Sequence, residues 1–150
     1  MSEELLDQLV GSWDLTGKMG TTDLRQKVEA DWVIQGHFLQ VHFIQEGPVL
    51  QDRPRYEAIY MLGYDSQSEE YTMHLFDTYG VRYARTIGVG MRRADSVEFL
   101  FEYPNGLFSN IFTWDRETDE WEMLLRQKGE NGKWKIFARK SLTRSRVENR

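Results

Sequence analysis

Four polar residues in the middle of the chain, His74, Arg85, Tyr103 and Asn110, are of types that bind or transform small molecules. If Tyr79-Gly80 forms a two-residue turn, His74 stands opposite Arg85, and both side chains point to one face together with Tyr103. An arginine on an apolar face is costly to bury unless it is paired, and its guanidinium fork matches a carboxylate. The group therefore predicts a site for a carboxylate-bearing ligand.

A second register of the same strands places this group outside. Apolar side chains alternate along residues 56–64, and the simplest hairpin aligns them with Tyr71, Met73 and Leu75. In that register His74 and Arg85 face solvent. The sequence leaves open which face of the strands between residues 56 and 91 points inward.

The strands nearer the C-terminus predict one continuous apolar face. Asn105-Gly106 and Asn131-Gly132 are strong hairpin signals, and residues 116–119 form a loop between the two hairpins. The predicted cross-strand pairs are Val97 with Trp114, Phe99 with Phe112, Phe101 with Asn110, Trp114 with Trp121, Phe112 with Met123, Leu125 with Ala138, and Gln127 with Ile136. The shared face then holds Val97, Phe99, Phe101, Tyr103, Phe108, Asn110, Phe112, Trp114, Trp121, Met123, Leu125, Gln127, Trp134, Ile136, Ala138 and Lys140. A shift by one residue would divide the aromatic side chains between two faces.

The rest of the chain repeats this strand pattern. Strands are predicted over 12–19, from Leu24 to Trp32, and over 37–45, 56–64, 71–77 and 82–91, with a polar loop over 47–55. Ser2, Glu3 and Glu4 begin a short helix whose Leu5, Leu6 and Leu9 cover one end of the sheet. Closure removes the exposed edges of so large a sheet. We therefore expect a single all-β domain over residues 1–150, an antiparallel up-and-down β-barrel of about ten strands with a short N-terminal helix capping one end.

A barrel of this size has an interior wider than side chains normally fill, so it favours a cavity for a small, largely hydrophobic ligand. The alternative is an interior filled by aromatic side chains. The predicted ligand-binding residues are Trp32, His74, Phe76, Tyr83, Arg85, Phe99, Phe101, Tyr103, Asn110, Phe112, Trp114 and Met123.

The composition of the chain argues against several kinds of binding partner. The net charge is -5 with both signs interleaved, which argues against nucleic acid. The acidic N-terminus and the absence of a long apolar run predict a cytoplasmic protein without a membrane span. The chain has no cysteine, and His37 and His42 fall on opposite faces of one strand, so we expect neither a metal site nor a cofactor.

The segment Gly11-Ser12-Trp13, preceded by a helical turn and followed by sequential hairpins, resembles the start of calycin barrels: the lipocalins, fatty-acid-binding proteins and nitrobindins. With Gly63-Tyr64-Asp65 and the segment from Trp32 to Gly36, the chain is most similar to calycin-like domains of unknown function. The resemblance implies ligand binding. It also implies that Trp13 lies at the closed end with a basic side chain over its ring, from Arg139, Lys140 or Arg144. Nitrobindins hold heme through a histidine near the C-terminal end, and this chain has none beyond His74.

Two other functions stay open. An enzyme of the isomerase, cyclase or decarboxylase type would use His74 with Tyr103 or Asp77 as general acid or base, although no motif requires catalysis and binding alone is favoured. An interaction module would use an outer apolar row, as a homodimer or covered by the N-terminal helix or the tail at 143–150. That row is Leu100, Ile111, Leu124 and Phe137.

Overall fold

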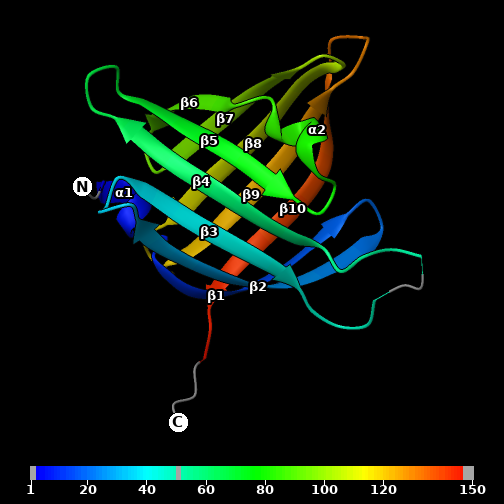
Figure 1. Cartoon of the computed structure of the whole chain (residues 1–150), viewed down its shortest axis with the longest axis horizontal. Helices are drawn as coiled ribbons and strands as arrows, with labels where there is room; N and C mark the ends of the chain where they lie inside the picture. The colour runs from blue at the N-terminus through cyan, green and yellow to red at the C-terminus, as the bar shows by residue number, and fades with distance from the viewer. Residues whose placement is uncertain (1–2, 50–51, 147–150) are drawn as a thin grey trace.

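The computed structural model, which describes residues 3–49 and 52–146, is a closed barrel in which each strand pairs antiparallel with the next and β1 pairs with β10 (Figure 1). Its strands are β1 (Gly11–Met19), β2 (Thr22–Val33), β3 (Phe38–Gln45), β4 (Glu57–Asp65), β5 (Glu70–Asp77), β6 (Gly88–Arg93), β7 (Ser96–Tyr103), β8 (Gly106–Asp115), β9 (Glu120–Lys128) and β10 (Trp134–Arg144). Two helices, α1 (Glu4–Asp7) and α2 (Val81–Ala84), complete the described part of the chain. The predicted ten-stranded all-β barrel with a short N-terminal helix is confirmed.

Helix α1 covers one end of the barrel, as predicted. Glu3 caps it by accepting a hydrogen bond from the Leu6 backbone N–H at 2.9 Å, a role that its carboxylate suits at a helix start. Leu5, Leu6 and Leu9 are buried in the core. Ser2, which was predicted to begin this helix, lies outside the described residues, as do residues 50 and 51 of the predicted loop.

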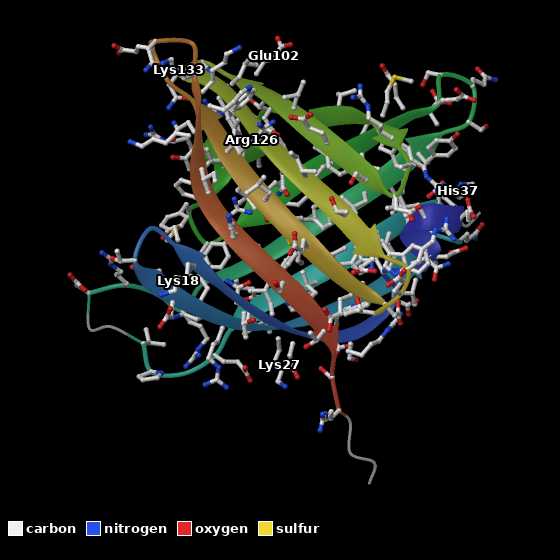
Figure 2. All side chains as sticks on the ribbon, turned by 180° about the vertical axis from the view of Figure 1, so that it is seen from behind. Lys18, Lys27, His37, Glu102, Arg126 and Lys133 are labelled. Atoms are coloured by element: carbon white, nitrogen blue, oxygen red, sulfur yellow. The ribbon has the colours of Figure 1, made fainter. Side chains whose placement is uncertain are left out.

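Period-two alternation explains which side chains enter the barrel. In β2, Gln26, Val28 and Ala30 are buried while Lys27 and Glu29 between them are exposed, and β3 repeats the pattern with Leu39, Val41 and Phe43 buried. The inner faces of neighbouring strands therefore merge into one core, and charged residues such as Lys18 and Lys27 lie on the outside (Figure 2).

The predicted registers toward the C-terminus are correct for β8 with β9, where Trp114 pairs with Trp121 and Phe112 with Met123. Between β7 and β8 the prediction is wrong by two residues, so that Phe99 pairs with Asn110. The hairpin turns at residues 104–105, because Tyr103 pairs with Gly106. An even shift keeps every side chain on its predicted face.

A β-bulge in β10 corrects a second prediction. Ala138 pairs with Leu125 as expected, but the register shifts between Ile136 and Ala138, and the inserted residue reverses the alternation. Trp134 and Ile136 were predicted to face inward. Instead Ile136 pairs with Arg126, whose guanidinium lies 4.6 Å from the Trp134 ring on the outer face.

The same bulge turns Phe137 toward Phe108, whose ring centroid lies 5.8 Å from its own, while Phe137 stays 43% exposed at the rim of the barrel. Phe137 therefore does not belong to the predicted outer row. Two of the remaining members, Ile111 and Leu124, are cross-strand partners. The third, Leu100, is 40% exposed. Neither α1, at the barrel end, nor residues 143 and 144, which continue β10, covers this row.

Between β4 and β7 the structure adopts the second of the two registers considered. Tyr60 pairs with Leu75 and Met61 with His74, which places His74 on the outer face. The strand predicted over 82–91 is wrong in its first half, because residues 81–84 form α2 and pairing of β5 with β6 is confined to Glu70–Met73. Gly88 then lets β6 pass over Phe101, since a Cβ there would lie 2.5 Å from the ring.

Candidate functional site: the barrel interior

Aromatic rings from opposite walls meet in the middle of the barrel. Tyr60 of β4 lies 4.5 Å from Phe43 of β3 and 6.3 Å from Phe112 of β8, measured between ring centroids. Phe112 in turn meets Phe99 edge to face at 6.0 Å. Edge-to-face and tilted contacts of this kind stabilise aromatic clusters beyond their buried area. The interior thus presents apolar ring surface from both sides.

Lys140 is the cationic side chain of this interior. It is 8% exposed, and its Nζ lies 6.0 Å from the centroid of the Phe43 ring. The paired residue on β1 is Gly17, where a Cβ would lie 2.2 Å from the carbonyl oxygen of Arg139, so the two strands approach closely there. Within residues 3–49 and 52–146, the Lys140 amine has no hydrogen bond or ion pair.

Burial dominates the acid–base behaviour of this amine. Removing an ammonium group from water favours its neutral form, and burial lowers the pKa of Lys140 to about 8 against a weaker opposing effect of the Asp77 carboxylate. Asp77 ends β5, on the far side of the barrel, and is half-buried. The interior therefore holds an amine that is partly neutral near physiological pH.

Two buried side-chain amides add to the polar set. Asn110 is fully buried, and among the described residues neither its Oδ1 nor its Nδ2 forms a hydrogen bond of good geometry, although the amide lies near enough to the Tyr60 hydroxyl to oppose the effect of burial on the pKa of Tyr60. Gln26 of β2 is 4% exposed, and its Oε1 also lacks a partner. Leaving such a group unpaired costs about 1–3 kcal/mol. Lys140, Asn110 and Gln26 are thus ready to form hydrogen bonds that the described residues do not supply.

Strand pairing relates two of these groups. Lys140 belongs to an inner row with Met123 and Phe112, and Asn110 belongs to a row with Leu125 and Ala138. The two rows are adjacent, because Ala138 and Lys140 are consecutive inward residues of β10. The amine and the amide therefore start from the same stretch of wall.

Tyrosines surround Asp77 at the other end of the barrel from α1. The Tyr56 hydroxyl donates a hydrogen bond to Asp77 Oδ2 at 3.1 Å. Burial, together with the Asp77 charge, raises the pKa of Tyr103 to about 12, and burial likewise raises the pKa of Tyr56 and Tyr60. These hydroxyls stay protonated at neutral pH and act as hydrogen-bond donors.

Helix α2 lies at this same end, which is the mouth of the barrel (Figure 1). Tyr83 of α2 meets Tyr103 edge to face at 5.7 Å, and Tyr103 stacks on Phe101 at 5.5 Å and 7°. A hollow of about 330 Å³ lies between the β1–β2 turn and the ends of β9 and β10. It is lined by Met19, Gly20, Gln127, Lys135, Ile136 and Phe137.

The structure brings most of the predicted site residues into the barrel and leaves others out. Those buried on the inner wall are Phe99, Phe101, Asn110, Phe112 and Met123, and those half-buried against the core are Trp32, Tyr103 and Trp114. The inward placement of His74, Phe76 and Arg85 is wrong. His74 and Phe76 lie on the outer face of β5, and Arg85 is exposed at the end of α2. Tyr83 is 39% exposed on α2 rather than on a strand.

The sequence interpretation missed the roles of Lys140, Gln26 and Tyr60 in this site. The signal was present for Lys140, which occupies the next inward position after Ala138, and for Gln26, which stands between Leu24 and Val28 on the apolar face of β2. A charged or amide side chain at an inward position is the feature to look for.

The proposed catalytic pairing of His74 with Tyr103 is also wrong, because the two side chains lie on opposite faces of the barrel wall. His42 faces outward and contacts the Glu57 carboxylate. In the described part of the chain, no group of three or more histidine, aspartate or glutamate side chains is arranged to hold a metal ion. None of the described helices is long and apolar enough to span a membrane.

At the closed end, the guanidinium of Arg144 lies 4.1 Å from the centroid of the Trp13 ring, which is the contact that the calycin resemblance implied. No family model matches the chain, and a search of curated proteins found no relative. Membership of the calycin superfamily therefore stays a prediction.

Proposed function

We propose that the protein binds a small, largely apolar ligand that carries an acidic head group, with the head group at Lys140. The observation that carries this proposal is a buried amine on an aromatic inner wall that forms no ion pair with any described residue. Burying an ammonium group is costly unless an opposite charge compensates it. A carboxylate would supply that charge, so Lys140 takes the part that the sequence interpretation gave to Arg85.

The aromatic wall suits the rest of such a ligand. Phe43, Tyr60, Phe99 and Phe112 offer ring faces and edges near Lys140 or across from it. Asn110 adds a donor and an acceptor to the head-group region. Apolar lining with few polar groups is the usual composition of small-molecule sites. Entry would be through the mouth, where the hollow beside Phe137 adjoins the inner wall.

The experiment is a calorimetric comparison of 2-naphthoate with 2-naphthalenemethanol, two probes that share an apolar body and differ in charge. We expect 2-naphthoate to bind more tightly to the full-length protein. Lys140→Met should weaken naphthoate binding by about 10-fold to 100-fold, the value of a charged hydrogen bond, and leave the alcohol nearly unaffected. Equal affinities for both probes, or an unchanged naphthoate affinity in the variant, would contradict the proposal.

Three further expectations from the sequence stay predictions: the cytoplasmic location, the absence of a nucleic-acid partner, and a homodimer through the outer row, from which the bulge in β10 removes Phe137 and leaves Leu100, Ile111 and Leu124. The last has a direct measurement, because Leu100→Lys should leave the naphthoate affinity unchanged while it converts any dimer to a monomer in analytical ultracentrifugation.

A further inference from the structure

The geometry of Lys140 points to covalent chemistry. We propose that the Lys140 amine forms a reversible imine with the aldehyde group of an apolar ligand held in the barrel, an inference that rests on the proposed function of the interior as a binding site. The amine starts from the inner wall, lies 6.0 Å from the Phe43 ring centroid and is not held in an ion pair by any described residue. Its lone pair is therefore not committed to a neighbouring acid.

The reaction needs no oxidant or second substrate. The Nζ lone pair attacks the carbonyl carbon, the new C–N bond forms as the C=O π bond opens, and the oxygen takes up the proton that the attacking nitrogen releases, which gives a carbinolamine. Loss of that hydroxyl as water, with departure of the nitrogen proton, gives the C=N bond. The reverse hydrolysis releases the aldehyde and the amine unchanged. Lysine is the usual residue for this chemistry when its amine is desolvated.

The protonation state of the amine supports this step. Only the neutral amine is nucleophilic, and a pKa of about 8 leaves roughly 9% of Lys140 neutral at pH 7. An amine at the ordinary lysine value of 10.5 would be neutral at roughly 0.03%, which is about 300-fold less. Asp77 is the charged group that acts on Lys140 from across the barrel, and it moderates the effect of burial without reversing it.

The interior also favours the imine once it forms. Imines hydrolyse in water, and an apolar site that excludes water slows that reaction. Asn110, on the adjacent inner row, has an amide N–H that makes no hydrogen bond of good geometry with the described residues and can donate to the carbinolamine oxygen. Lys27 offers a built-in comparison, because it lies on the outer face with its Nζ 2.6 Å from Asp14, and this hydrogen bond raises its pKa.

The test uses the full-length protein with 2-naphthaldehyde and sodium cyanoborohydride at pH 7, which converts an imine into a stable secondary amine. We expect the intact mass to rise by one naphthylmethyl group, and peptide mapping to place it on Lys140 at least 10-fold above Lys27. Lys140→Arg should abolish this adduct, because a guanidinium group does not form the imine, whereas Lys27→Arg on the outer face should leave the adduct on Lys140 unchanged.

The outcomes separate the two proposals. Naphthoate binding without an adduct on Lys140, or with an adduct spread evenly over Lys27 and other exposed lysines, overturns the imine and leaves the binding proposal intact. Failure of both naphthoate binding and labelling overturns both. Labelling of Lys140 that survives competition by excess 2-naphthoate would show that the amine reacts outside the binding site, and would likewise overturn the inference.

Discussion

The closed end of the barrel and the middle of its inner wall differ in how their buried polar groups are paired. At the end covered by α1, the indole N–H of Trp13 donates to the Leu9 carbonyl at 2.7 Å, and that of Trp32 donates to Asp7 at 2.8 Å. The Tyr71 hydroxyl donates to Glu3 at 2.7 Å. On the inner wall, Lys140 is 8% exposed and Asn110 is fully buried, and within the described residues neither side chain forms an ion pair or a hydrogen bond of good geometry.

This difference in pairing determines how each group affects the stability of the protein. A satisfied buried polar group contributes to the free energy of unfolding, whereas an unsatisfied one lowers it. We infer that the paired polar groups of the closed end raise the free energy of unfolding. The unpaired groups around Lys140 lower it and are available for the proposed ligand. Substitutions at the two places should therefore change stability in opposite directions.

The largest effect is expected for Trp13→Ala at the closed end. The substitution removes a fully buried ring, leaves the Leu9 carbonyl unpaired and deprives Arg144 of its stacking partner. The free energy of unfolding in urea should fall by about 3–5 kcal/mol. Trp134→Ala, on the outer face, is the matched control and should cost less than about 1 kcal/mol.

Equal losses for the two tryptophan variants would contradict the role given to the closed end. If Trp13→Ala does not fold, Trp13→Phe tests the same point, since it keeps a ring in the core and removes the hydrogen bond to Leu9.

Lys140→Met should act in the opposite direction. Replacing a buried, unpaired cation by an apolar side chain of similar length removes a desolvation cost, so the free energy of unfolding should rise by about 1–3 kcal/mol at pH 7. Lys27→Met is the control on the outer face, where it removes the ion pair with Asp14 and should bring no gain. A loss of stability in Lys140→Met would mean that the amine is paired in solution.

The pH dependence of the free energy of unfolding follows from the direction in which the pKa of Lys140 is shifted. Because the pKa of Lys140 is lowered in the folded protein, the unfolded chain binds more protons between about pH 8 and 10.5, and stability rises with pH across that range. The contribution of one lysine is at most about 1.4 kcal/mol per pH unit. The difference in unfolding free energy between Lys140→Met and the native protein should therefore shrink from pH 8 to pH 10, and a constant difference would refute the shift.

The smallest changes in stability are expected for two matched substitutions, each of which removes one polar group. Tyr71→Phe removes the hydrogen bond to Glu3 at the closed end and should cost about 0.5–1.5 kcal/mol. Asn110→Leu removes an unpaired amide from the interior and should be neutral or stabilising by up to about 1 kcal/mol. Thermal unfolding of both variants at pH 7 decides the comparison, which fails if Asn110→Leu is the more damaging of the two.

The fold was largely predictable from the sequence because alternation and hairpin signals reinforce one another. Trp114 and Trp121 pair as predicted because the loop at 116–119 fixes their register. The bulge at Phe137 was not predictable, since an inserted residue leaves no compositional mark and reverses the faces of Trp134 and Ile136. Local alternation also could not show that residues 81–84 leave the sheet as α2.

The apolar lining of the site could be predicted from the sequence, but the role of the charged residue at its centre could not. Phe99, Phe112 and Asn110 were placed correctly because their face survives an even shift of register. Two registers were compatible with the sequence around His74 and Arg85. The observed register aligns the apolar side chains of β4 with those of β5, and it places His74 and Arg85 outside. Lys140 was assigned to the inner face, but its importance depends on the absence of a partner, which only the packed barrel reveals.

The most direct test of the account is the titration of the Lys140 amine by NMR, followed through its side-chain ¹³Cε resonance and assigned with Lys140→Arg. In the free protein we expect a pKa of about 8 for this amine. With saturating 2-naphthoate we expect this pKa to rise by at least about 1, because a neighbouring carboxylate favours the charged amine. An unchanged pKa in the presence of the bound probe would contradict the claim that Lys140 holds the head group.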